Sequence, residues 1–183
     1  MIIDGKKTAT ELREKLKKKI IELKSSSNSV PGLTVILVGE DPASKIYVKN
    51  KEKFAKEIGI NSEVIRYSEN VDEKVVLDKI KELNKNKKVS GILVQLPLPK
   101  HIKKRKIIET ILPRKDVDGF HPVNVGNLSL GYESNIPCTP MGCYLLLKKA
   151  EKNLSGKHAV VIGRSNLNGK PMAQLLLKEN CTV

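Results

Sequence analysis

Tyr47 and Lys51 lie one helical turn apart in the segment KIYVKNKEKFAKEIGI, which covers residues 45–60. Side chains at positions i and i+4 of a helix share one face, so the phenol and the amine would point the same way. A lysine amine is a poor base at neutral pH unless burial or neighbouring positive charge disfavours its charged form. Lysine-rich helices also produce this spacing by chance, so the pair indicates catalysis only if other residues converge on it.

The helix that carries this pair is expected to start at the edge of a sheet. Residues 31–39, PGLTVILVG, form an apolar run typical of a buried strand. Asp41 is the expected N-cap, Pro42 the first helical residue and Gly59 the C-terminal stop. Because open α/β folds bind ligands at the carboxyl ends of their strands, the first half of this helix lies where a ligand would bind.

Two more polar side chains are expected near that edge. Gln95 ends the apolar run of GILVQLPLP, residues 91–99, where two prolines stop the strand. Asp118 lies in KDVDGFHPVNVG, residues 115–126, and taken alone it reads as an ordinary turn residue.

Short apolar runs alternate with helical stretches, which predicts an α/β fold with a mostly parallel sheet. Strands are expected at residues 31–39, 62–67, 89–96 and 157–163. Helices are expected from Thr8, which has capping-box spacing to Glu11, and over 41–59, 72–85, 102–111, 140–152 (capped by Thr139) and 169–179. Between 112 and 139 the periodicity disappears, so we expect a long functional loop and a boundary between domains 1–138 and 139–183.

The charge balance favours an anionic partner without specifying nucleic acid. The formal net charge is +14 and the pI is about 9.7. Lysine carries most of the positive charge and is interleaved with glutamate along every expected helix, as on solvated helix faces. Aromatic residues for base stacking are scarce, and tryptophan is absent.

The cysteines and the hydropathy place the chain among soluble, cytoplasmic proteins without a metal site. Cys138, Cys143 and Cys181 lack the spacing of a disulfide framework or a zinc site. The N-terminus does not resemble a signal peptide, and no apolar run is long enough to cross a membrane.

Five segments resemble the bifunctional methylenetetrahydrofolate dehydrogenase/cyclohydrolase family of one-carbon metabolism, in the family's order and with similar spacing. They are VGEDPASKIYVKNKEKFAKEIGI, GILVQLPLP, KDVDGFHPVNVGNL, PCTPMG and HAVVIGRSNLNGKPMA. The resemblance implies a three-layer, folate-binding catalytic lobe over 1–138. It also implies an incomplete Rossmann-type NAD(P)-binding lobe over 139–183.

The resemblance assigns roles to the residues at the expected sheet edge. Lys51 resembles the catalytic lysine of the cyclohydrolase step, and the neutral amide of Gln95 can orient its amine without adding negative charge. Tyr47 resembles the tyrosine that lines the folate cleft and assists the lysine. Asp118 resembles the carboxylate that binds the two adjacent N–H donors of the pterin.

The segment VVIGRSNLNGKPMA resembles the family's dinucleotide loop, although it is not a GxGxxG motif. Gly163, Arg164, Ser165, Gly169 and Pro171 are the implied cofactor residues. Glycines let a backbone approach phosphate, and a helix N-terminus can hold it. Arg164 could pair with an adenosine 2′-phosphate, which favours NADP over NAD.

Family members continue beyond the position of Val183, so the resemblance also implies a C-terminally truncated chain. It is either a fragment of an ordinary enzyme or a natural remnant that keeps the folate-binding lobe without hydride transfer. Polyglutamylated tetrahydrofolates are the expected ligands, and the intact family member is expected to be a homodimer. The rivals are an inactive folate-binding remnant and a basic nucleic-acid-binding module.

Overall fold

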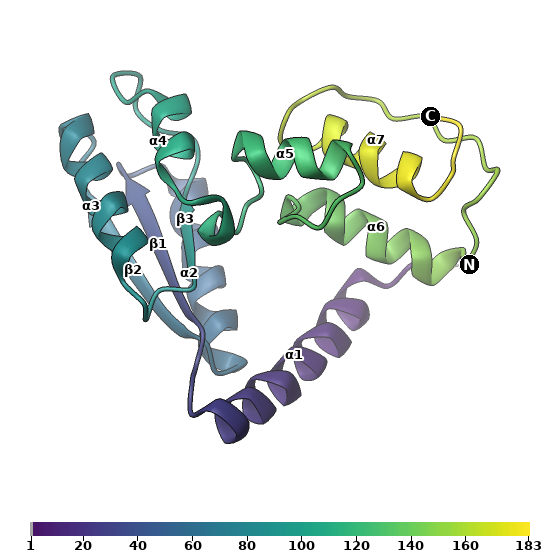
Figure 1. The fold of residues 1–183 in the computed structure, drawn as a ribbon, viewed down its shortest axis with the longest axis horizontal. Helices are drawn as coiled ribbons and strands as arrows, with labels where there is room; N and C mark the ends of the chain where they lie inside the picture. Colours follow the sequence, from purple (N-terminus) through teal and green to yellow (C-terminus); the bar gives the residue numbers. More distant parts are fainter. Residues whose placement is uncertain (1) are drawn as a thin grey trace. The chain divides into compact units, whose positions relative to one another are not determined.

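The computed structural model describes residues 2–183, which divide into two compact units (Figure 1). One unit is Ala9–Asp116, and the other combines the residues up to Thr8 with Val117–Val183. Within residues 2–183, no helix is both long enough and apolar enough to cross a membrane.

The first unit contains a parallel sheet of three strands in the order β2-β1-β3. The strands are β1 (Gly32–Val38), β2 (Asn61–Tyr67) and β3 (Gly91–Val94). In the ladders, Gly32 faces Asn61 and Leu33 faces Gly91. Six of the seven β1 residues are buried, as expected for the central strand of a covered parallel sheet. The predicted parallel sheet is therefore confirmed.

Helices cover this sheet in layers. They are α2 (Pro42–Glu57), α3 (Glu73–Lys85) and α4 (Lys104–Thr110), followed by the short 3-10 helix η1 (Pro113–Lys115). One core cluster joins Ile36 and Ile92 of the sheet to Ile80 of α3 and Ile107 of α4. Helix α2 packs against β1 and β2. The predicted three-layer α/β arrangement is confirmed.

Helix α1 (Gly5–Ser27) begins earlier than predicted. The Asp4 carboxylate accepts a hydrogen bond from the backbone N–H of Lys7 at 2.9 Å, so Asp4 performs the capping role predicted for Thr8. The Thr8 hydroxyl instead donates to the Asp4 carbonyl at 2.9 Å. The capping-box prediction was wrong because a better cap lies one turn upstream.

The second unit contains α5 (Pro122–Ser129), α6 (Cys138–Ala150) and α7 (Gly169–Lys178). Helix α5 and the 3-10 helix η1 lie in the stretch 112–139, which was predicted to be a loop. Helix α6 starts at Cys138, so Thr139 lies inside it and is not its cap. At the far end of α7, Glu179 accepts hydrogen bonds from Tyr144 at 2.5 Å and Lys148 at 2.6 Å. These two bonds fasten α7 to α6.

The predicted strand 157–163 does not form. Its only ladder contact within residues 2–183 is one parallel bridge between His158 and Thr182. Val160 is 81% exposed and Ile162 fully exposed. The segment has the apolar composition of a buried strand. A strand also needs a neighbouring strand that pairs with its backbone, and in the described chain only the one bridge with Thr182 provides such pairing.

Candidate active site

The side chains of Lys51 and Gln95 meet at the carboxyl edge of the sheet. The Lys51 ammonium donates a hydrogen bond to Gln95 Oε1 at 3.0 Å. The amide N–H of Gln95 donates to the Leu96 carbonyl at 2.7 Å, which directs the amide oxygen toward the lysine. Both side chains belong to half-buried residues, so the pair is partly shielded and still reachable by a ligand.

Gln95 is positioned by the sheet itself. Its backbone N–H donates to the carbonyl of Ile36 at 2.9 Å, which continues the β1–β3 pairing one step past the end of β3. Ile36 is fully buried in the central strand. The amide of Gln95 therefore sits on a rigid edge.

Lys51 is positioned by the cap and the packing of α2. The Asp41 carboxylate accepts from the backbone N–H of Ser44 at 2.8 Å and fixes the first turn, which confirms the predicted N-cap. Hydrogen bonds from the side chain and then the backbone of Ser44 lower the pKa of Asp41. Val48, fully buried, anchors the middle of the helix. Gly59, at φ +89, follows the C-terminus in the left-handed conformation expected of a helix stop.

Tyr47 lies one turn before Lys51 and is 62% exposed. Within residues 2–183 its hydroxyl has no hydrogen-bond partner. It therefore presents a ring and a free hydroxyl at the surface of α2, on the face that carries Lys51.

No carboxylate of the described chain pairs with Lys51. The acidic residues nearby form salt bridges with other lysines. Glu52, on α2, accepts from Lys56 at 2.7 Å, and Glu40, just before α2, pairs with Lys45. The Lys56 ammonium lowers the pKa of Glu52. A neutral amide is thus the polar partner of the Lys51 amine, as the sequence led us to expect.

Asp118 belongs to the second unit and is half-buried. The next residue, Gly119, has φ +67 and lies against the backbone of Asn135, where an added Cβ would be 2.4 Å from the carbonyl oxygen. Glycine is therefore required there, and the turn fixes the backbone of Asp118. His121 accepts from the N–H of Val123 at 3.1 Å and caps α5.

The predicted cofactor residues lie in the loop that leads into α7 and in the first turn of that helix. Gly169 is buried against Gly163, where an added Cβ would be 2.2 Å from the carbonyl oxygen. The Ser165 hydroxyl accepts from the N–H of Asn168 at 3.1 Å, and the Ser165 carbonyl accepts from the N–H of Lys170 at 3.0 Å. Pro171, buried in the first turn of α7, completes the set. Small residues and backbone contacts hold this loop together.

A hollow of about 380 Å³ lies beside this loop. Gly163, Arg164 and Gly169 line it together with Lys170, which the sequence reasoning missed. The sequence does contain a signal for Lys170. It lies between the glycine and the proline of NGKPMA, and so places a second cation beside Arg164 at the N-terminus of α7. Two cations and a glycine-rich backbone suit a phosphate group.

Comparisons with known proteins agree across both units. Residues 3–118 match the family described as tetrahydrofolate dehydrogenase/cyclohydrolase, catalytic domain, and residues 137–183 match its NAD(P)-binding domain. The bifunctional protein FolD of Pelagibacter ubique is 72% identical over 183 residues, covering 100% of this chain and 65% of its own length.

Two solved structures share the fold. The FolD crystal structure from Campylobacter jejuni is 50% identical with a TM-score of 0.96, covering 100% of this chain and 64% of that one. The FolD of Trypanosoma brucei, complexed with NADP and an inhibitor, is 34% identical with a TM-score of 0.94, covering 100% of this chain and 62% of that one. The chain thus spans about two thirds of the length of these relatives.

Proposed function

The chain belongs to the tetrahydrofolate dehydrogenase/cyclohydrolase family, and from this premise we propose that it acts in one-carbon folate metabolism. The proposed reactions are the NADP-dependent oxidation of 5,10-methylenetetrahydrofolate to 5,10-methenyltetrahydrofolate and its hydrolysis to 10-formyltetrahydrofolate. The observation that carries the hydrolytic step is the 3.0 Å contact between the Lys51 amine and the Gln95 amide oxygen.

In the hydrolysis, the oxygen of water adds to the methenyl carbon and gives up one proton. The hydroxyl proton that remains is lost as the carbonyl forms, one carbon–nitrogen bond of the five-membered ring breaks, and the departing nitrogen takes up a proton. The neutral Lys51 amine accepts a proton from the attacking water and releases it to solvent afterwards. Because methenyltetrahydrofolate is a cation, one proton is released overall and the charges balance. Gln95 orients the amine through its amide oxygen. Because the amide is neutral, it does not stabilise the ammonium form as a carboxylate would.

Tyr47 and Asp118 are the further residues proposed to bind folate. The exposed ring and unpartnered hydroxyl of Tyr47 support a direct contact with substrate beside Lys51. Asp118 offers two acceptors to the adjacent N–H donors of the pterin, and the turn at Gly119 supports a fixed carboxylate.

The cofactor proposed for the oxidation is NADP rather than NAD. The residues fit a phosphorylated dinucleotide, because Arg164 and Lys170 line one hollow with the backbone of Gly163 and Gly169. Arg164 would hold the 2′-phosphate, Ser165 would bind next to it, and Pro171 would keep the first turn of α7 in place. When bound, the nicotinamide accepts the hydride. NADP in the relative from Trypanosoma brucei supports this choice.

The proposed organisation is a catalytic domain over 1–138 and the start of the nucleotide-binding domain over 139–183. The two family matches, which end at 118 and resume at 137, support a boundary in this region. We include in the proposal polyglutamylated folates as ligands, a homodimer as the assembly of the whole protein, and a cytoplasmic location. The three free cysteines suit a reducing compartment.

Replacing Lys51 by Met tests the assignment, because it keeps the length of the side chain and removes the base. We expect hydrolysis of methenyltetrahydrofolate, followed by its absorbance, to fall by a factor of about 10²–10⁴, the usual contribution of a positioned base. Lys49→Met, on an exposed neighbouring residue of α2, is the matched control. Near-normal turnover in the Lys51 variant would refute the proposed role.

A further inference from the structure

A second hollow, of about 620 Å³, lies where α3 ends and the chain leads into β3. Five basic side chains line it, namely Lys81, Lys85, Lys87, Arg114 and Lys115. No aspartate or glutamate of the described chain is among its lining residues. We refer to it as the basic hollow, and none of the proposed folate or nucleotide residues borders it.

Lys115 lies at the base of the basic hollow and is only 7% exposed. Its ammonium donates to the carbonyl of Leu83 at 2.9 Å and to the carbonyl of Asn86 at 2.8 Å. These bonds satisfy carbonyls at the end of α3 and leave one of the three ammonium N–H groups for another acceptor. Burial lowers the pKa of Lys115, and the positive charge of Arg114 lowers it further.

Asn84 fixes the wall of the basic hollow. Its amide N–H donates to the carbonyl of Thr110 at 2.7 Å, and its amide oxygen accepts from the N–H of Leu112 at 3.1 Å. Together with Lys115, Asn84 ties the end of α3 to the segment that follows α4. A site with fixed walls loses little entropy when a ligand binds.

Three of the cations that line the basic hollow have no ion-pair partner in the described part of the chain. Within residues 2–183, Lys85, Lys87 and Arg114 form no salt bridge. Lys81, which also lines the hollow, is paired with Asp78 at 2.9 Å, and Lys79 of the same helix is paired with Glu82 at 2.6 Å. Unpaired cations around a concave surface concentrate the field that attracts an anion.

We propose that the basic hollow binds a phosphate-bearing organic anion of nucleotide size. Three unpaired cations exceed what one carboxylate neutralises, whereas a phosphate monoester carries a charge of about −1.5 to −2 at neutral pH. The Arg114 guanidinium can bind phosphate through two parallel hydrogen bonds. Val89 and Leu112 provide apolar surface for the organic part, and a volume of 620 Å³ is in the range of small-molecule sites.

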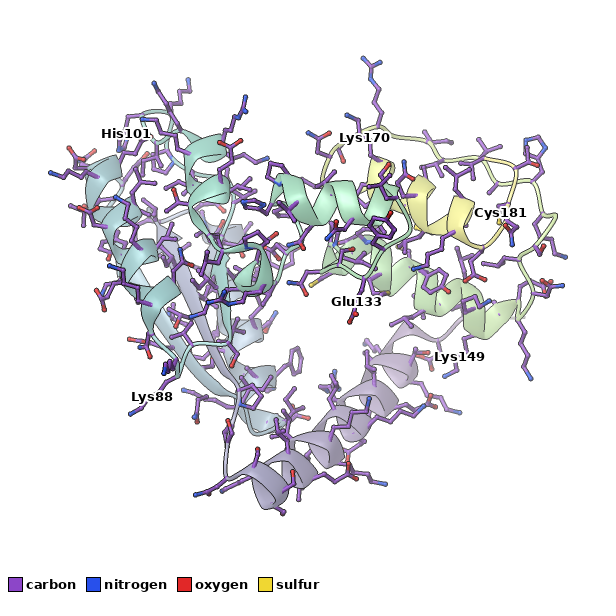
Figure 2. All side chains as sticks on the ribbon, viewed as in Figure 1. Lys88, His101, Glu133, Lys149, Lys170 and Cys181 are labelled. Atoms are coloured by element: carbon purple, nitrogen blue, oxygen red, sulfur yellow. The ribbon has the colours of Figure 1, made fainter. Side chains whose placement is uncertain are left out.

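The basic hollow lies at the opposite edge of the sheet from the candidate active site. Val89 precedes β3 and Gln95 follows it, and a strand segment of this length spans about 20 Å. Figure 2 shows Lys88 and His101, which flank β3 in the sequence, at opposite ends of this unit. The basic hollow is therefore spatially separate from the Lys51–Gln95 pair.

The first experiment is a lysine acetylation footprint of the intact protein, read by mass spectrometry. With ATP as the probe, we expect Lys85 and Lys87 to be protected while the adjacent exposed Lys88, which does not line the hollow, keeps its reactivity. Adenosine should protect neither residue, because it lacks phosphate. Equal protection of Lys87 and Lys88 would overturn the proposal and show diffuse charge attraction.

The second experiment measures ATP binding by calorimetry in an Arg164→Ala background, which weakens the proposed nucleotide site of the other unit. We expect Arg114→Ala and Lys87→Ala each to weaken binding about tenfold, and Lys88→Ala to leave it unchanged. Pyrophosphate should compete with ATP if phosphate is the recognised group. The proposal is wrong if the hollow variants bind ATP as tightly as Lys88→Ala does. In the otherwise unchanged protein, Arg114→Ala and Lys87→Ala are expected to keep hydrolysis of methenyltetrahydrofolate.

Discussion

The amine of Lys51, on α2, donates to the amide oxygen of Gln95, at the end of β3, across a separation of 44 residues in the sequence. Each side chain is fixed by its own element: Lys51 by the Asp41 cap and the buried Val48, and Gln95 by its backbone bond to Ile36. A neutral acceptor facing an amine is the feature that the proposed chemistry requires, because it orients the nitrogen without favouring its protonation.

Replacing Gln95 by Glu should convert this contact into an ion pair. A carboxylate favours the ammonium form of Lys51, so the neutral amine would become available only at higher pH. We expect slower hydrolysis at neutral pH and a rate profile displaced toward alkaline pH. Gln95→Met is the matched control: it should slow the reaction without displacing the profile. A Glu variant with the original pH profile would contradict the proposed role of the pair.

Gly169→Ala should disrupt the loop before α7. The added Cβ would be 2.2 Å from the carbonyl oxygen of Gly163, so backbone must move. We expect a loss of about 1–3 kcal/mol in stability, as for overpacked sites, together with weaker NADP binding. Gly142→Ala, within α6, is the control because nothing lies within 4 Å of its Cβ; it should stabilise the helix by about 0.5–1 kcal/mol. Thermal unfolding and NADP titration of both variants provide the measurement.

The cluster of Tyr144, Lys148 and Glu179 should make the second unit sensitive to pH at both extremes. Hydrogen bonds from Lys148 and Tyr144 lower the pKa of Glu179, so this contribution is present above the ordinary carboxyl range and lost as pH falls through the lowered value. The hydrogen bond to Glu179 raises the pKa of Tyr144 from 10.0 to about 12, so its contribution is present below pH 10 and lost as pH rises toward 12.

Tyr144→Phe separates these two effects. We expect thermal unfolding of the second unit to lose part of its alkaline dependence between pH 10 and 12, and to keep its acid dependence through Lys148. Tyr132→Phe is the matched control, since Tyr132 is 64% exposed. An unchanged alkaline limb in the Tyr144 variant would show that the hydrogen bond to Glu179 adds nothing to stability.

Sequence reasoning predicted best where local chemistry decides the structure. Asp41 with Pro42 defined the start of α2, and Gly59 marked its end, because caps and left-handed glycines act within one turn. The strand predicted at 157–163 failed because its hydrogen bonds depend on a neighbour that composition does not reveal. Lys115 reads as one more surface lysine, and only the fold shows that it is buried and bound to two carbonyls at the end of α3.

The candidate site could be predicted only where its residues follow from local rules. The carboxyl-edge rule led to Gln95 and Lys51, since both follow from strand ends and helix periodicity. Helix α5 was missed because the segment from Pro122 is short and lacks a clear apolar face, although His121 caps it. Lys170 was missed because its importance depends on the folding of a loop onto Gly163.

Asp118 provides the sharpest test of folate recognition, because its carboxylate is proposed to accept two hydrogen bonds from the pterin at once. Asp118→Asn keeps the shape and one acceptor but replaces the other with a donor, which would face a pterin N–H and repel it. Asp118→Ala removes both acceptors and leaves room for water. We therefore expect the Asn variant to bind tetrahydrofolate at least as weakly as the Ala variant, each with a loss of about 1.5–3 kcal/mol in equilibrium titrations. Wild-type affinity in the Asn variant would show that the carboxylate does not face the pterin donors.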